Sequence, residues 1–531
     1  MNSLLLKSIK CSYSIVISFV FVADVAVAKI GNDLVEFECV NCVSIDFDCS
    51  FPGEKISPYI YGIAFHARKN HLDKNWLFEL NPTTRRWGGN PTSRYNWRIN
   101  SWNTAQDWYF RNIETGKEFV FERDFIVENT KKKILSNVTL PLLGWVAKDN
   151  HSGSFPVNMF PDQLSVDLSS GFGNGENKYG KIHVAPEVTS KIISNEDIDE
   201  WVSRIVMSAE GQVNFSLGNE PMLWNHTHHD VHPKPVGYKE VIDKSIELAG
   251  VVKKYPNTFV SGPGSWGWPS YFYSSLDMKT GVQYGDDQSR YKTPFLEWYL
   301  EKFRELESKT GSRHLDALDI HYYPQAEGVF QGTDNPDMRV RSTRSLWDKE
   351  YVDESWVDEP IYLIPRMKRI IEKNYPKTKL IIGEYSFGQT NDVSGAIAVA
   401  ESLGVFAQHG VYAAYYWVYP KRYSSSYWGF RMFRNFDGKG SSFAGNMLTT
   451  YREKMYSHYV GIDESKKRVT IIAINGNKEK KRLRVNSKNC AEILSSRHFE
   501  FDGNGKIEER RPRQTMPLKG RSLALIEVKF R

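Results

Sequence analysis

Two glutamates stand at the ends of apolar segments, where a carboxylate can do chemistry. Glu220 lies in residues 213–221, an apolar run that ends in glycine, asparagine, the glutamate and proline. Because proline cannot continue a central strand, a strand here must stop and leave the carboxylate at its C-terminal end. Glu384 has the same setting in residues 380–387. We interpret Glu220 as a candidate catalytic acid and Glu384 as its partner.

Eight near-continuous apolar segments, separated by stretches long enough for helices, indicate a parallel sheet. The predicted strands are residues 59–65, 85–90, 139–145, 213–221, 258–262, 315–324, 380–387 and 411–420. Helical patterns between them include residues 237–253, 295–308, 361–374 and 394–408. Eight such units imply an α/β fold of the closed (β/α)8 TIM-barrel type, with its active site at the C-terminal ends of the strands. A doubly wound open sheet is the competing topology, but no glycine-rich dinucleotide loop follows any strand.

The barrel places the two glutamates opposite each other. Strands four and seven are not neighbours, but their ends face across a mouth about 15 Å wide. Two glutamate side chains can then bring their carboxyl groups to about 5–5.5 Å, as in a retaining glycosidase, whereas an inverting enzyme needs roughly 6.5–9.5 Å. A salt-bridged structural group is the alternative for either carboxylate alone. Two of them on these strands, each beside residue types that bind sugars, favour catalysis.

Polar residues at other strand ends can support this pair. His321 and Tyr323 share one side of the sixth strand, so Tyr323 can donate a hydrogen bond to Glu384. Arg86, in the second strand, can lower the pKa of the same carboxyl group with its fixed charge. Asn219 is a suitable partner for a sugar 2-hydroxyl. For His321 a structural hydrogen bond explains the residue at least as well as direct catalysis.

Aromatic residues make up 14% of the chain, more than a core usually needs, and flat rings can stack on sugar faces. Four tryptophans lie at or just beyond strand ends, where they can floor a groove: Trp87, Trp224, Trp268 and Trp417. Packing in the core is an equally good explanation of each single ring. The net charge of +6 is spread without long blocks of one sign, which argues against nucleic acid and anionic surfaces as partners.

The first 28 residues resemble a signal peptide. Residues 1–10 carry two lysines and no acid, residues 11–23 are mostly apolar, and 26–28 read Ala-Val-Ala. The apolar stretch is too short to span a bilayer, although an uncleaved anchor is the alternative. We predict cleavage after Ala28 and a secreted protein, extracellular or periplasmic, with no membrane attachment after cleavage.

Short strand patterns replace the helical period in the C-terminal part, for example in residues 469–474 and 522–528. We predict that residues 57–440 form the catalytic barrel and residues 441–531 a β-sandwich. Residues 29–56 precede the first barrel strand and are expected to supply strands to that sandwich.

Four cysteines remain after the predicted cleavage: Cys39, Cys42, Cys49 and Cys490. An even number in an exported protein suggests disulfides, and three pairings are open. One pairing ties the N-terminal strands to the C-terminal region. A zinc site is the weaker alternative because a second Cys-x-x-Cys is missing.

Six motifs, in order from about Tyr59 to the last barrel strand, together resemble glycoside hydrolase family 44. They are residues 86–90, 218–221, Trp224 with 230–233, 318–325, 341–348 and 383–385. The resemblance implies an endo-acting β-1,4-glucanase active on cellulosic glucans and often on xyloglucan, with a barrel and a β-sandwich. It implies Glu220 as acid/base and Glu384 as nucleophile, with Tyr385 among the supporting residues. It implies no cofactor for the chemistry, while some members bind metal ions such as structural calcium.

The expected partner is therefore a β-glucan polysaccharide, bound by a monomer. We expect no separate carbohydrate-binding or dockerin-like module after the sandwich, so that the cleft itself would hold the polymer. Two alternatives stay open: the same scaffold acting on mannan or xylan, and a catalytically inactive polysaccharide-binding protein. The presence of both glutamates argues against the second.

Overall fold

The computed structural model describes residues 42–65, 75–116, 119–280, 286–330, 335–388 and 391–531. The predicted signal peptide and Cys39 lie outside these residues. Within them, every helix is too short or too polar to cross a membrane.

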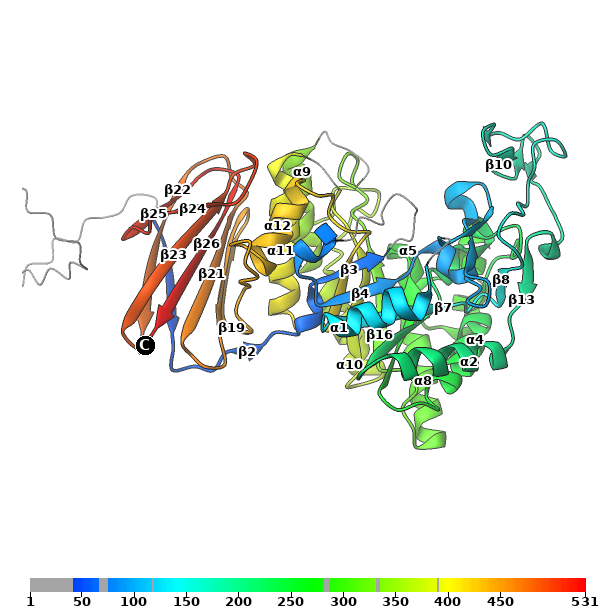
Figure 1. Ribbon diagram of the computed structural model, residues 1–531, viewed down its shortest axis with the longest axis horizontal. Coiled ribbons are helices and arrows are strands. Elements are labelled where there is room, and N and C mark those ends of the chain that lie inside the picture. The colour runs from blue at the N-terminus through cyan, green and yellow to red at the C-terminus, as the bar shows by residue number, and fades with distance from the viewer. Residues whose placement is uncertain (1–41, 66–74, 117–118, 281–285, 331–334, 389–390) are drawn as a thin grey trace, which may run out of the picture. The chain divides into compact units, whose positions relative to one another are not determined.

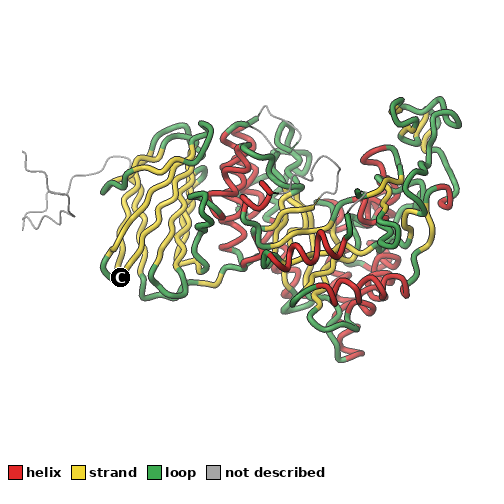
Figure 2. Tube along the Cα trace, in the orientation of Figure 1, coloured by secondary structure: helices red, strands yellow, loops and turns green. Residues whose placement is uncertain are grey.

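Eight parallel strands close into a barrel, as predicted (Figures 1 and 2). In chain order they are β3 (Gly62–Phe65), β4 (Thr84–Trp87), β7 (Leu135–Leu140), β14 (Val213–Leu217), β15 (Thr258–Ser265), β16 (Ala317–Tyr322), β17 (Lys379–Tyr385) and β18 (Ala413–Tyr416). Every predicted strand overlaps one of these. The barrel brings the end of β14, which precedes Glu220, and the end of β17, which contains Glu384, to the same mouth.

The third barrel strand departs most from its predicted position. The sequence predicts it at residues 139–145, but β7 spans Leu135–Leu140 and ends before Pro141. Its inward face is polar, since Asn137 Oδ1 accepts a hydrogen bond from the Ser216 hydroxyl at 2.9 Å inside the barrel. This strand therefore lacks the continuous apolar run that identifies the others.

The four predicted helices are confirmed as α4 (Tyr238–Val252), α8 (Phe295–Thr310), α10 (Leu363–Asn374) and α11 (Val393–Gln408). The remaining helices are α1 (Glu128–Lys131), α2 (Asn195–Ser208), α3 (Trp224–Thr227), α5 (Trp268–Phe272), α6 (Ser275–Thr280), α7 (Asp286–Tyr291), α9 (Pro336–Ser342) and α12 (Ser425–Arg434). A short 3-10 helix, η8 (Pro221–Leu223), directly follows Glu220.

The C-terminal strands form two sheets that share an apolar core, and N-terminal strands join both, as predicted. The larger sheet has the order β2-β19-β20-β21-β26-β23-β24 and the smaller β1-β22-β25. Their bounds are β1 (Cys42–Asp48), β2 (Glu54–Lys55), β19 (Asn446–Glu453), β20 (Tyr456–Ile462), β21 (Arg468–Asn475), β22 (Lys481–Lys488), β23 (Ile493–Phe501), β24 (Glu508–Arg510), β25 (Thr515–Leu518) and β26 (Ser522–Phe530). A disulfide between Cys49 and Cys490 links β1 to the segment after β22. Of the pairings left open by the sequence, this is one that joins the N-terminal strands to the C-terminal region.

Helix α11 belongs to the barrel and to the C-terminal sheet at once. All fourteen residues from Ser394 to Ala407 are buried, because one side packs on the barrel and another on strands of the larger sheet. A helix covered all round needs apolar or small residues on every face. Glu401 is the charged exception: it accepts hydrogen bonds from Tyr459 at 2.9 Å and from Arg452 at 3.2 Å, both in the sheet.

Between β8 (Trp145–Ala147) and β13 (Ser190–Ile192) the chain makes a loop-rich excursion, marked by β10 in Figure 1. It contains two small hairpins, β9 (Val166–Asp167) with β10 (Phe172–Gly173) and β11 (Glu176–Asn177) with β12 (Gly180–Lys181). Lys181 Nζ donates to the backbone carbonyl of Asn225 at 2.6 Å, which fastens the excursion to α3.

Candidate active site

Glu220 is fixed at the barrel mouth by a sharp change of backbone direction after β14. Gly218 has a φ of 77°, and a Cβ atom there would lie 2.8 Å from the Cβ of Leu142, so glycine is required. Glu220 itself has a φ of 45°, in the left-handed region that costs a residue with a side chain energy. Its amide donates to the carbonyl of Gly264 at 3.0 Å, which ties it to β15. The carboxyl group thus leaves the strand end at a defined point.

Glu384 reaches the same mouth because β17 contains a bulge. The pairing with β16 is shifted so that His321 lies opposite Glu384, and Gly383 is the extra residue. The bulge moves the alternation of side chains by one position and puts Glu384 on the side of His321. A Cβ atom on Gly383 would lie 2.2 Å from Asp319 Oδ1. Glycine is needed here because a buried carboxylate occupies the space of a side chain.

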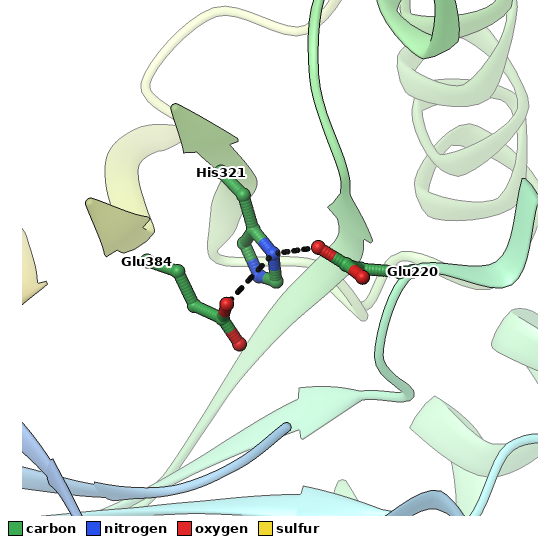
Figure 3. Close-up of side chains that lie close together, drawn as sticks. All are labelled: Glu220, His321 and Glu384. Carbon is green, nitrogen blue, oxygen red and sulfur yellow. Dashed lines mark hydrogen bonds and ion pairs between the residues drawn. The ribbon is translucent and has the colours of Figure 1, made fainter. Parts of the chain in front are cut away.

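The two carboxyl groups approach closely, as Figure 3 shows. One oxygen of Glu220 and one oxygen of Glu384 lie within 4.8 Å of each other. His321 stands between them, with Nδ1 2.8 Å from Glu220 Oε1 and 3.6 Å from Glu384 Oε2 (Figure 3). This separation is near the value of about 5–5.5 Å that is typical of retaining glycosidases, and it is shorter than the roughly 6.5–9.5 Å of inverting ones.

Glu384 is surrounded by groups that stabilise its charge. Arg86 Nη1 donates to Oε1 and the Tyr323 hydroxyl donates to Oε2, each at 2.7 Å. Burial alone would raise the pKa of Glu384, but the charges of His321 and Arg86 and the hydrogen bonds outweigh it, so that its pKa is lowered. Glu384 is therefore held as a carboxylate.

Glu220 has the opposite environment. Burial raises its pKa above the ordinary value, and the charge of Glu384 adds to the effect. The hydrogen bond and charge of His321 and the charge of Arg86 lower this pKa, but by less. Two like carboxyl groups thus acquire different proton affinities, as an acid and a nucleophile require.

His321 has partners on both ring nitrogens. Its Nε2 lies 3.4 Å from Arg86 Nη2, and because a guanidinium can only donate, Nε2 has to accept. The ring proton then sits on Nδ1, which faces Glu220 and Glu384. Burial lowers the pKa of His321, but the nearby carboxylates outweigh burial and raise it.

Asn219 is held beside Glu220 by two neighbours. Arg86 Nη2 donates to its Oδ1 at 2.9 Å, so one guanidinium joins Asn219 to Glu384. The indole nitrogen of Trp224 donates to the Asn219 backbone carbonyl at 3.1 Å. Its role toward a sugar hydroxyl stays a prediction.

Below the mouth lies Asp319, a buried carboxylate that sequence reasoning missed. Its Oδ2 accepts hydrogen bonds from the hydroxyls of Ser216 and Ser261, each at 3.2 Å. Burial raises its pKa, while the charges of Arg86 and His321 lower it. A signal was present: Asp319 precedes His321 by two residues, so both side chains face the barrel interior.

Three aromatic residues expected near the substrate are buried elsewhere. Trp87 and Trp224 are both 0% exposed, so the expectation that they floor a groove is wrong. Trp87 packs within an aromatic cluster behind β4, and Trp224 supports Asn219. Tyr385 is also buried and packs against helix α11 through Phe406, because the bulge turns it outward.

Trp268 and Trp417 are the two predicted rings that remain half-buried. The guanidinium of Arg366 lies 5.0 Å from the centre of the Trp268 ring. Trp417 follows β18, and its ring lies so close to Gly89 that a Cβ atom there would be 2.3 Å from it. These two rings keep the exposed surface that a stacking role needs.

The implied calcium ion finds no suitable ligands at this site. Among the described residues, one group of three side chains has ligand atoms near enough to share a metal, and it is Glu220, His321 and Glu384. Arg86 lies against two of these three, which places a fixed positive charge where the cation would be. Calcium prefers about six to eight oxygen ligands. The trio therefore does not fit it, and a calcium ion stays an expectation without assigned ligands.

Glu220 follows the fourth barrel strand, and Glu384 lies opposite it in the seventh strand. This arrangement is typical of the glycoside hydrolases built on the (β/α)8 scaffold. The model of glycoside hydrolase family 44 matches residues 101–326 of the chain.

Its relatives agree with this assignment. Endoglucanase A of Paenibacillus lautus is 31% identical over 454 residues, which cover 80% of this chain and 62% of that protein. The crystal structure of CelM2, a bifunctional glucanase-xylanase from a metagenome library, is 28% identical with a TM-score of 0.84, covering 92% of this chain and 99% of CelM2. A Paenibacillus polymyxa xyloglucanase of family 44 is 26% identical with a TM-score of 0.75, over 92% of this chain and 99% of its own. The chain thus spans less than two thirds of the curated relative's length.

Proposed function

We propose that this protein is an endo-acting β-1,4-glucanase that hydrolyses cellulosic glucans or xyloglucan with retention of configuration. The observation that carries the proposal is the pair of carboxyl groups within 4.8 Å, one with a raised pKa and one with a lowered pKa. The names of the relatives, an endoglucanase and a xyloglucanase, support a β-glucan as the substrate class.

In the first step, Glu220 gives its proton to the glycosidic oxygen while a Glu384 oxygen attacks the anomeric carbon. The bond between that carbon and the glycosidic oxygen breaks, and the leaving chain departs as an alcohol. Arg86 and Tyr323 keep Glu384 ionised and orient it for attack. His321 donates its Nδ1 proton toward Glu220 and holds that carboxyl group near the scissile bond.

In the second step, water attacks the anomeric carbon of the glycosyl-enzyme, and Glu220, now ionised, takes the water's proton. The ester bond to Glu384 breaks and restores its carboxylate. Glu220 begins and ends the cycle protonated. The loss of the Glu384 charge in the intermediate lowers the pKa of Glu220, which lets it change from acid to base.

We also propose that the protein is exported through its N-terminal segment. The residue pattern of positions 1–28 supports this proposal. Expression of the full chain with N-terminal sequencing of the product tests it: a mature protein that starts at Lys29 is expected, and an intact Met1 contradicts it.

The decisive experiment measures reducing ends released from barley β-glucan, xyloglucan, mannan and xylan in parallel, with Glu384→Gln as the inactive control. Release from the glucans with early loss of viscosity supports the proposal. Faster release from mannan or xylan replaces the substrate, and binding without release from any polymer favours the inactive binding protein.

A further inference from the structure

The C-terminal part of the chain carries far more positive charge than the rest. Residues 441–531 contain 20 lysines and arginines against 10 aspartates and glutamates, a net charge of +10. Since the whole chain carries +6, the residues before 441 carry −4. The absence of long blocks of one sign, which argued against an anionic partner, therefore hides a strong asymmetry between two parts of the molecule. Such an asymmetry is typical of proteins that bind a polyanion.

The smaller sheet of the sandwich gathers part of this charge on its outer face. Along β22, Leu483 is buried in the sandwich core, whereas Arg482 and Arg484 on either side of it are exposed. Two positions along a strand separate side chains by about 7 Å. This distance is shorter than the Debye length of about 8 Å at physiological ionic strength, so the two charges repel each other.

Neither arginine is neutralised by the sheet around it. Within the described residues, the side chains of Arg482 and Arg484 have no hydrogen bond and no ion pair. Their four cross-strand neighbours are uncharged: Cys42 and Ser44 on β1, and Pro517 and Thr515 on β25. The segment that enters β25 adds two more exposed cations, Arg511 and Arg513. An anion that binds here would relieve the repulsion between the arginines.

The acids of this face lie at its other end. Asp46 and Asp48 stand further along β1, opposite Asn486 and Lys488. Asp46 accepts a hydrogen bond from Asn486 Nδ2 and Asp48 accepts one from Asn489 Nδ2, each at 2.8 Å. Both carboxylates thus have partners of their own, and the positive end of the face stays available.

A hollow of about 620 Å³ adjoins the positive end of the face. Ser44, which lies opposite Arg484, belongs to its lining. Its charged lining residues are three lysines and two glutamates: Lys454, Lys480, Lys481, Glu453 and Glu479. Tyr451 also lines it and is 45% exposed, although it stacks on His458. An exposed ring beside cationic groups can pack on the face of a charged sugar.

An acidic polysaccharide has the chemistry that matches this surface. A guanidinium binds a carboxylate through two parallel hydrogen bonds, and carboxylates recur along a chain of uronic acids. A membrane surface would require apolar side chains to insert, but the exposed side chains that the structure describes on this face are polar apart from Pro517. Nucleic acid would match the charge, but the proposed export brings the protein to polysaccharides instead.

We propose that the outer face of the smaller sheet binds an acidic polysaccharide whose sugars carry carboxylates, with Arg482 and Arg484 as its ion-pairing contacts. The bound polymer keeps the barrel close to neutral glucan that is mixed with it. This consequence rests on the glucanase function proposed above, whereas the binding itself does not.

The test titrates the protein into a fluorescently labelled oligogalacturonate at about 150 mM salt and measures anisotropy. The parent protein should bind it, and Arg482→Gln/Arg484→Gln should raise Kd by about tenfold or more, because charge-assisted hydrogen bonds are lost. The fully methyl-esterified oligomer has the same backbone without the charge and should bind weakly to both proteins. Equal binding of the charged and esterified oligomers would overturn the proposal.

Arg304→Gln/Arg369→Gln is the matched control. These two arginines are exposed on α8 and α10 of the barrel, so the variant loses the same charge outside the proposed face. Its Kd should stay within about twofold of the parent value. Equal weakening in both double variants would show that net charge, and not this face, binds the polymer. Tighter binding of a DNA oligonucleotide with the same number of charges would replace the polysaccharide as the partner.

Failure of the proposed function gives a different result. On films of β-glucan mixed with polygalacturonate, the parent protein should release reducing ends faster than Arg482→Gln/Arg484→Gln. On β-glucan alone the two should be equal, because the arginines lie outside the barrel mouth. A protein that binds the oligogalacturonate but cleaves no glucan refutes the glucanase and supports the binding face. A protein that cleaves glucan without binding the oligogalacturonate overturns the binding face alone.

Discussion

Glu220 and Glu384 show how two identical side chains acquire different proton affinities. Arg86, Tyr323 and His321 converge on Glu384, whereas among the described residues Glu220 has His321 as its one direct side-chain partner. The difference therefore comes from the number of donors that each carboxyl group receives. Two predictions follow from this arrangement.

The first prediction concerns the acid. Glu220→Ala should lose most activity on polysaccharide, because a sugar leaving group needs the proton, but should still form the glycosyl-enzyme from an activated aryl glycoside. Added azide should then restore turnover and give the β-glycosyl azide, detected by NMR. An α-azide product would exclude retention, and the absence of rescue would count against Glu220 as the acid/base.

The second prediction concerns pH. Tyr323→Phe removes a donor to the Glu384 carboxylate, so the pKa of Glu384 should rise. Activity requires Glu384 ionised, and the acidic limb of the kcat/KM profile should therefore move to higher pH by about one pH unit. The basic limb, set by loss of the Glu220 proton, should move much less.

Tyr322→Phe is the matched control, because Tyr322 is the adjacent buried tyrosine and packs toward Phe387 instead. Its pH profile should coincide with that of the parent protein. An acidic limb that moves down in Tyr323→Phe would show that the hydroxyl does not stabilise the Glu384 carboxylate.

At the scale of the element, the bulge in β17 decides which way Glu384 points. Regular alternation would put Gly383 opposite His321 and turn Glu384 away from the barrel interior. The extra residue is a glycine because Asp319 fills the space of its side chain. The bulge and the buried carboxylate therefore depend on each other.

Gly383→Ala tests this dependence. The new methyl group would overlap Asp319 Oδ1 and press on His321, so we expect a loss of stability of about 1–3 kcal/mol and a larger loss of kcat than of substrate affinity. Gly250→Ala in α4 is the control, since nothing lies within 4 Å of its Cβ position. That change should stabilise the protein by about 0.4–1 kcal/mol. Unchanged kcat in Gly383→Ala would mean that the strand absorbs the methyl group without moving Glu384.

The sequence was sufficient for features that follow from local chemistry. Apolar runs locate the barrel strands, and proline and glycine mark the end of the strand before Glu220. It was insufficient where tertiary contacts decide. Three features depend on which face of a strand or loop meets the interior: the shift of β7, the bulge at Gly383, and the burial of Trp87 and Trp224. The order of residue types along the chain does not determine which face this is.

At the scale of the whole molecule, the barrel and the C-terminal sheet share one apolar layer. Strands β20, β21 and β26 have both faces covered, which explains their continuous apolar sequences: one face packs in the sandwich core and the other on α11. Glu401 and Arg452 form a buried charged contact across this layer, and both side chains are at most 10% exposed.

Glu401→Ala should therefore destabilise the entire chain. It leaves Arg452 buried without its ion pair, and we expect a cost of about 3–5 kcal/mol in the free energy of unfolding, measured by urea denaturation. Activity of the folded protein on an aryl glycoside should be retained, since the change lies outside the mouth. Glu453→Ala is the control, because Glu453 is an exposed acid next to Arg452 in β19, and this change should have little effect on the free energy of unfolding. Equal midpoints for the two variants would contradict a shared layer.

Helix α11 has a consequence for the modularity of the protein. A domain can be exchanged between proteins only if its boundary surface tolerates water or a new neighbour, and α11 has no face that does. The C-terminal sheet is therefore an integral part of the catalytic unit and not a separable domain. A barrel expressed without the sheet would expose the apolar surface of α11 and aggregate. The solved structure of CelM2 matches this chain over both parts, as expected if the two are inherited as one piece. Engineering of this scaffold should accordingly graft new binding modules beyond the sheet and leave the contact with α11 intact.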